Sequence, residues 1–159
     1  TWEWDGKDWT QRKPTTVPPA RYFHDVTSAG PNGGVLLWGG YGGSLSNPIP
    51  LNDAWLWDGR DWKPAPSTVA PPANASHRMA YDAARGEVIL FGGISTGDTW
   101  AWNGKTWRIA LARSFAPSAR DDHATAYDAA RGRLVRFGVS RGRDRPGGAR
   151  AVCWRRDHG

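Results

Sequence analysis

The stretch Trp55-Leu56-Trp57-Asp58-Gly59-Arg60-Asp61-Trp62 decides how this chain folds, because it occurs three times. An earlier copy runs from Trp2 to Trp9 and a later one from Trp100 to Trp107. Nine of the eleven tryptophans fall in these copies, at the same three positions of each. Repeats spaced about 50 residues apart are typical of propellers and solenoids, so the repeat determines the architecture before any single element is assigned.

Each copy is predicted to form a β-hairpin. The dipeptide at its centre, Asp58-Gly59 in the quoted copy, is typical of a two-residue type I′ turn, in which both residues take positive φ. Across such a turn the first and third tryptophans, Trp55 and Trp62, are expected to stack on each other. The same stacking is expected of the equivalent pairs Trp2/Trp9 and Trp100/Trp107.

Two further blocks precede the hairpin in each complete repeat. A histidine (His24, His77 or His123) opens a short segment that ends in a turn. A continuous apolar run then ends in glycine, as in Val35 to Gly40 and Val88 to Gly93, which predicts a strand buried on both faces. The double glycines are expected where backbones approach closely or φ is positive.

Proline-rich segments separate the repeats. Residues 12–20, 63–73 and 111–119 contain prolines, whose missing N–H disfavours a place inside a sheet, so these segments are predicted to cross between sheets. Each repeat then contains four short strands in about 50 residues, which is the size and strand count of a propeller blade.

These residues resemble kelch repeats. The likeness lies in the apolar strand that ends in Gly39-Gly40 or Gly92-Gly93, and in hairpin tryptophans separated by six residues. The Trp-x-Trp-Asp-Gly hairpin is similar to the bacterial kelch-type form, and the central domain of galactose oxidase belongs to the same group. The resemblance implies four-stranded antiparallel blades around a channel, used mostly to recognise proteins or other ligands.

The sequence therefore predicts an all-β fold, a partial kelch-type β-propeller with two complete blades and two half blades. Half blade 1–11 is followed by blades 21–64 and 74–110 and by half blade 121–138. Because propellers close with about four blades or more, ring closure is expected to need missing blades or another chain. The repeat stops after Gly138, and residues 139–159 are predicted to be an aberrant, disordered Arg/Gly-rich tail, from a reading-frame change or an unselected terminus.

Composition bears on the class of partner and on the compartment. Most of the net charge of +6 belongs to residues 139–159, which hold six Arg and two Asp, and the basic residues are not interleaved with aromatic ones, so no nucleic-acid partner is expected. No run of about 18 apolar residues is present, so no membrane span is expected. The single cysteine, Cys153, allows no intrachain disulfide. The resemblance favours a bacterial protein that is secreted or extracytoplasmic.

The residues that could bind metal or catalyse are interpreted as structural. One histidine per repeat could converge on a metal, but the spacing has no local ligand pattern, so a packing role is favoured and no metal or cofactor is predicted. Asp53 and Asp98 are interpreted as turn or loop anchors, with ligand binding as the alternative. No catalytic motif is present, and the Cys–Tyr pair of kelch-type copper oxidases is not expected with Cys153 in the tail, so the chain is not predicted to be an enzyme.

Binding residues are expected where the repeats differ, because loops on a rigid scaffold carry function. The long loop from Tyr41 to Asn52 and the segments before each first strand differ most. The candidates are Arg21, Tyr22, Phe23, Tyr41, Asn47, Arg120, Asp121 and Asp122. The leading hypothesis is a non-catalytic recognition scaffold that binds a protein partner through its blade loops. The alternative is a carbohydrate-binding or carbohydrate-active propeller whose glycan site lies in missing blades or a companion domain.

Overall fold

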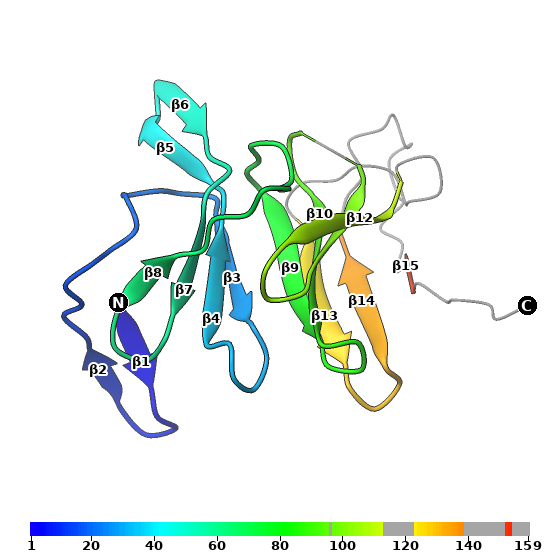
Figure 1. Cartoon of the computed structure of the whole chain (residues 1–159), viewed down its shortest axis with the longest axis horizontal. Coiled ribbons are helices and arrows are strands. Elements are labelled where there is room, and N and C mark those ends of the chain that lie inside the picture. The colour runs from blue at the N-terminus through cyan, green and yellow to red at the C-terminus, as the bar shows by residue number, and fades with distance from the viewer. Residues whose placement is uncertain (96, 113–122, 139–151, 154–159) are drawn as a thin grey trace, which may run out of the picture.

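The computed structural model describes residues 1–95, 97–112, 123–138 and 152–153, and every regular element among them is a β-strand (Figure 1). The strands are β1 (Trp2–Trp4), β2 (Trp9–Gln11), β3 (Asp25–Ser28), β4 (Val35–Trp38), β5 (Tyr41–Ser44), β6 (Asn47–Pro50), β7 (Ala54–Trp57), β8 (Trp62–Pro64), β9 (His77–Asp82), β10 (Glu87–Gly92), β11 (Thr99–Trp102), β12 (Trp107–Leu111), β13 (Ala124–Asp128), β14 (Arg133–Phe137) and β15 (Val152–Cys153).

The strands form several small antiparallel sheets. The first large sheet has the order β3-β4-β7-β8, and the second has the order β9-β10-β11-β12. β1 and β2 form a separate hairpin, β5 and β6 form another, and β13, β14 and β15 form a three-stranded sheet. The prediction of an all-β fold is confirmed. The two four-stranded sheets span residues 25–64 and 77–111, against predicted ranges of 21–64 and 74–110.

Strand β15 lies in the segment predicted to be a disordered tail, whose other residues are outside the described ones. It pairs with β14 in a register that places Cys153 opposite Val135. The second sheet has the equivalent register between β10 and β11, where Ala101 stands opposite Ile89. Two residues of the tail therefore take the position of a third strand in their sheet.

The two four-stranded sheets pack face to face around one apolar core. Its buried members are Leu36, Trp38 and Ala54 from the first sheet and Met79, Val88, Leu90, Trp100, Trp102 and Trp107 from the second. The first strands of successive sheets lie side by side, β3 against β9 and β9 against β13. Between β3 and β9, the backbone N–H of Met79 donates to Asp25 Oδ2 at 2.6 Å. The chain is thus a stack of sheets whose first strands are neighbours.

The N-terminal hairpin β1–β2 lies against the other face of the first sheet (Figure 1). The indole nitrogen of Trp57 donates to Glu3 Oε1 at 2.7 Å, and that of Trp62 donates to Thr1 Oγ1 at 2.8 Å. The outer face of the hairpin is open: Trp4 is 52% exposed, whereas its equivalents Trp57 and Trp102 are 5% and 3% exposed. Packing tryptophans were predicted in all three copies, and they are buried in the second and third only.

The turns of the tryptophan hairpins differ from the prediction. Trp57 pairs directly with Trp62, so the loop between them has four residues instead of two. Of these four only Gly59 has positive φ, at +91°, and the carboxylate of Asp58 accepts from two backbone N–H groups of the loop. The prediction of a type I′ turn is wrong because the Asp side chain bonds its own loop, and an Asp-Gly sequence suits either geometry.

The longer loop also changes which tryptophans meet. The second and third of each copy are neighbours, with ring centroids 5.5 Å apart for Trp57 and Trp62. The equivalent pairs Trp4/Trp9 and Trp102/Trp107 have centroids 5.5 Å and 6.4 Å apart. Trp55 stands opposite Pro64 instead of Trp62, so the predicted stacking of first and third tryptophans is wrong.

The double glycines lie where the backbone is crowded, as predicted. Gly40 has a φ of +96°, and a Cβ there would lie 2.8 Å from the Cβ of His24. Gly93 has a φ of +88°, and a Cβ there would overlap the side-chain oxygen of Asn74. A side chain at either position would therefore be both strained and obstructed.

Candidate functional site

Five of the eight predicted binding residues lie in the described part of the chain, and Arg120, Asp121 and Asp122 lie outside it. The five belong to two neighbouring segments: the stretch before β3 and the hairpin β5–β6. Figure 1 shows this hairpin projecting from the end of β4, away from the sheets. The structure brings three of the five, Tyr22, Phe23 and Tyr41, into mutual contact.

Arg21 forms a structural ion pair. Its guanidinium nitrogens Nη1 and Nη2 donate to Asp53 Oδ1 at 2.6 Å and Oδ2 at 2.7 Å. The arginine side chain is only 3% exposed, and Nη1 also donates to the carbonyl of Gly39. Burial acts to raise the pKa of Asp53, but the bonds from Arg21 and from the Trp55 indole outweigh it and hold this pKa below its ordinary value. The expected anchoring role of Asp53 is confirmed.

The second repeat shows what the position of Arg21 does. Asn74 is the equivalent residue, and its carboxamide nitrogen donates to the carbonyl of Gly92 at 2.8 Å, as Arg21 does to Gly39. Both side chains therefore fix the first glycine of a double-glycine pair. Arg21 was predicted to bind a ligand, but its burial and this shared contact make it a structural residue that is not part of the exposed binding surface.

Three aromatic rings form a cluster at the base of the projecting hairpin. The ring of Tyr22 lies 5.4 Å from that of Phe23 and 5.5 Å from that of Tyr41, centroid to centroid. Tyr22 and Tyr41 also pair through backbone hydrogen bonds of 3.0 Å and 2.8 Å, and the Tyr22 hydroxyl donates to the carbonyl of Ser44. These bonds fix the hairpin to the segment before β3.

The hairpin β5–β6 also carries exposed aliphatic side chains, and Ile49 pairs with Gly42, on the opposite face of the hairpin from Tyr41. Leu45 at its tip is 84% exposed and Ile49 on β6 is 53% exposed, while Phe23 at its base is 56% exposed. Asn47, also predicted to bind, is exposed at the start of β6. We call the set Tyr22, Phe23, Tyr41, Leu45 and Ile49 the aromatic surface. Sequence reasoning missed Leu45 and Ile49, although both lie in the loop it selected.

Phe23 has an uncommon backbone conformation, with a φ of +52°. Its equivalent in the second repeat, Ser76, has a φ of +57°, so the fold imposes this conformation at the position before the histidine. The left-handed region disfavours bulky side chains, yet the first repeat carries a phenylalanine there with its ring exposed. The choice of Phe is therefore not explained by backbone preference or by burial.

The repeated histidines pack on aromatic rings of the preceding sheet. The imidazole of His77 meets Trp38 edge to face with centroids 5.0 Å apart, and that of His123 meets Phe91 at 6.2 Å. Both histidines are buried. Burial, with a smaller effect from the charge of Arg78, lowers the pKa of His77 to about 3. The expected structural role agrees with this packing, and Asp98, the other proposed anchor, is half-buried.

Replacing His77 with phenylalanine is expected to reduce the loss of stability in mild acid. Because the folded-state pKa is lowered, only the unfolded chain gains a proton as pH falls below about 6.5. This linkage destabilises the wild type by up to about 1.4 kcal/mol per pH unit in that range. Urea unfolding at pH 7, 6 and 5 measures it, and equal slopes for both proteins would contradict the buried, neutral His77.

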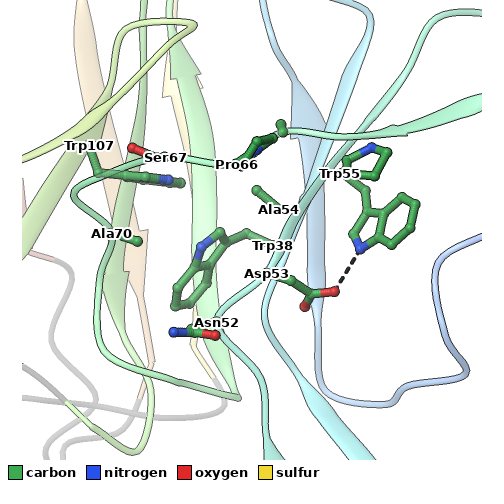
Figure 2. Close-up of a pocket in the computed structure, with 11 residues that line it drawn as sticks. Trp38, Asn52, Asp53, Ala54, Trp55, Pro66, Ser67, Ala70 and Trp107 are labelled. Carbon is green, nitrogen blue, oxygen red and sulfur yellow. Dashed lines mark hydrogen bonds between the residues drawn. The ribbon is translucent and has the colours of Figure 1, made fainter.

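A pocket of about 320 Å³ lies between the first and second large sheets (Figure 2). Its walls are largely apolar and come from the end of β4, the start of β7, the segment after β8 and the start of β12. The lining residues are Trp38, Asn52, Asp53, Ala54, Trp55, Pro64, Ala65, Pro66, Ser67, Ala70 and Trp107. Sequence reasoning missed this pocket because it treated the tryptophans as packing residues and the prolines as a crossing.

Asp53 connects the pocket to the aromatic surface. It lines the pocket, and it also pairs with Arg21, the residue that precedes Tyr22 of the aromatic surface. Figure 2 shows the indole nitrogen of Trp55 bonded to the Asp53 carboxylate, a contact of 2.6 Å. The two candidate sites therefore share one structural support.

The described residues contain no group of three or more His, Cys, Asp or Glu side chains that could hold a metal ion. Within the same residues, no helix has the length and apolar character needed to cross a membrane. In comparison with known proteins, the chain matches no family model and no curated protein.

Proposed function

We propose that the chain is a segment of a kelch-type β-propeller that acts as a non-catalytic recognition scaffold and binds a protein partner through the aromatic surface. The arrangement of the sheets supports this proposal. The two four-stranded sheets stack face to face and the strands β3, β9 and β13 lie side by side, as expected of neighbouring blades around a channel. The observation that carries the binding proposal is the projecting hairpin β5–β6, which lies between β4 and β7 and has no counterpart between β10 and β11 among the described residues.

The composition of the aromatic surface favours a protein partner. Aromatic residues are enriched at protein interfaces. The exposed side chains of Leu45 and Ile49 add apolar surface whose burial against a partner is favourable. The outer edge of β6 is poorly suited to strand pairing, because Pro48 and Pro50 lack an N–H. Recognition is therefore assigned to side chains, supported by the ring cluster at the base.

Selection of random peptides displayed on phage tests this function with a defined probe. We expect peptides with a shared motif to be enriched, and to bind Phe23→Ala and Ile49→Ala at least about tenfold more weakly, a loss typical of central interface residues. Ile109→Ala is the matched control, since Ile109 is 51% exposed and Ile49 is 53% exposed, on different sheets. Failure to enrich a motif, or equal loss with Ile109→Ala, would contradict the proposal.

A further inference from the structure

The indole N–H of Trp38 is a buried donor without a hydrogen-bond acceptor. Trp38 is completely buried, and its Nε1 makes no hydrogen bond. Other tryptophans of the same repeat donate to side-chain oxygens, Trp55 to Asp53 and Trp57 to Glu3. Buried donors normally have acceptors, so this N–H needs an explanation.

The unpaired N–H belongs to the wall of the pocket between the large sheets. Figure 2 shows the Trp38 ring in the pocket, with its nitrogen on the side that faces Trp107 and Ala70. Trp107 meets Trp38 edge to face, with centroids 5.9 Å apart, and an aromatic face is only a weak acceptor. Trp100 also has an unpaired buried N–H, but it does not line this pocket. A ligand in the pocket can supply the missing acceptor once a small movement of the surrounding side chains uncovers this nitrogen.

The other groups of the pocket restrict the charge of such a ligand. Asp53 is the only ionised side chain among the lining residues, and Arg21 neutralises it through two hydrogen bonds. A charged ligand would find no opposite charge left to pair with. The pocket therefore favours an uncharged molecule.

The remaining polar capacity requires a ligand that both donates and accepts. Asp53 Oδ1 accepts a hydrogen bond from Arg21 and keeps a lone pair for a further donor. Asn52 is exposed at the mouth and its carboxamide can donate or accept. A hydroxyl group donates and accepts at one atom, so it meets all these needs. The tryptophan and proline walls call for an apolar face as well.

We propose that this pocket binds one uncharged pyranose ring, with a sugar oxygen accepting from Trp38 Nε1. A pyranose combines an apolar C–H face with hydroxyl groups that donate and accept. The volume of about 320 Å³ lies at the lower end of the usual range for ligand pockets, which suits a single ring. This binding site is separate from the aromatic surface and does not depend on the protein partner proposed above.

Titration of the whole chain with neutral monosaccharides tests the proposal. The probes are glucose, galactose, mannose and N-acetylglucosamine, followed by ligand-observed NMR and by the indole N–H resonances. We expect at least one sugar to bind with a dissociation constant on the order of 1 mM, as for small polar ligands. The Trp38 indole resonance should move while that of Trp100 stays in place.

Two phenylalanine variants isolate the unpaired donor. Trp38→Phe removes the N–H and keeps an aromatic ring, so sugar affinity should fall about tenfold, the loss of one good hydrogen bond. Trp100→Phe removes an equally buried, unpaired N–H outside the pocket, and its affinity should change less than about twofold. Asn52→Ala, at an exposed position, should weaken binding about threefold and keeps the test decisive if Trp38→Phe does not fold.

Several results would overturn the proposal. They are the absence of binding by all four sugars, equal affinities for Trp38→Phe and Trp100→Phe, and an effect of Asn52→Ala below the error of the titration. Glucuronate binding as tightly as glucose would refute the preference for an uncharged ring. Binding of a blocked proline amide at the Trp38 indole in place of any sugar would assign the pocket to peptide and reject the pyranose.

Discussion

Replacing Trp107 with alanine is expected to lower the free energy of unfolding by about 3–5 kcal/mol, as for other large-to-small changes in a core. Trp107 is 2% exposed and lies between the two large sheets, where its ring meets those of Trp38 and Trp102. The cavity would open at the contact that joins the sheets, so the neighbouring chain cannot easily close it. Urea unfolding followed by far-UV circular dichroism measures the loss.

The repeat supplies matched controls for this prediction. Trp62 and Trp9 occupy the equivalent position in the other copies and are 9% and 63% exposed. Trp62→Ala should cost nearly as much as Trp107→Ala, whereas Trp9→Ala should cost about 1 kcal/mol or less, since it loses mainly its contact with Trp4. A similar loss in all three variants would mean that burial in the stack does not determine the contribution of these tryptophans.

Replacing Asp53 with alanine is expected to cost about 3 kcal/mol, the lower end for breaking a buried ion pair, because its carboxylate is 39% exposed. The change would leave the guanidinium of Arg21 buried with only the carbonyl oxygens of Pro19 and Gly39 as partners. It would also remove the acceptor of the Trp55 indole. Thermal unfolding should show the loss as a fall of several degrees in Tm.

Glu3 provides the matched control, because its carboxylate also accepts from one arginine and one tryptophan. Arg12 Nε donates to it at 2.6 Å and Trp57 Nε1 at 2.7 Å. The Arg12 side chain is 48% exposed, however, so Glu3→Ala leaves a cation that water can solvate and should cost much less stability than Asp53→Ala. Equal losses for Asp53→Ala and Glu3→Ala would show that the burial of Arg21 is not what makes its partner important.

The pH dependence of the Asp53 contribution has a definite sign. Its pKa is lowered in the folded state, so the stabilisation is complete above the ordinary carboxyl range and disappears as pH falls through the lowered value. The difference in stability between wild type and Asp53→Ala should therefore be constant near neutrality and shrink in strong acid. This behaviour separates Asp53 from His77, whose effect begins near neutral pH.

The sequence predicted the sheets well because the repeat fixed their boundaries independently of local propensity. Three copies of the Trp hairpin set the ends of β7 and β11, and the runs before Gly39 and Gly92 set β4 and β10. Local geometry was predicted less well. An Asp-Gly pair does not state how many residues its loop contains, and the four-residue loop moved every tryptophan to a different cross-strand partner.

The candidate site was predicted in part for a similar reason. Variation between repeats selected Tyr22, Phe23 and Tyr41, and the structure brings these rings together. Variation also selected Arg21, which is buried, because a framework contact can be made by Arg–Asp in one repeat and by Asn in the next. The pocket was not predictable, since it arises from the packing of two sheets and has no signature in either one.

Because the outer face of β1–β2 is open, this hairpin is stabilised by one neighbour only, whereas the first large sheet is stabilised by two. In a linear array of repeats, the stability of each unit is its own folding free energy plus the coupling to each neighbour. The first large sheet has coupling on both faces, from the hairpin and from the second sheet, whereas the hairpin has coupling through Glu3 and Thr1 on one face only. The hairpin is therefore the unit that separates first, and the first large sheet can remain folded after it has left.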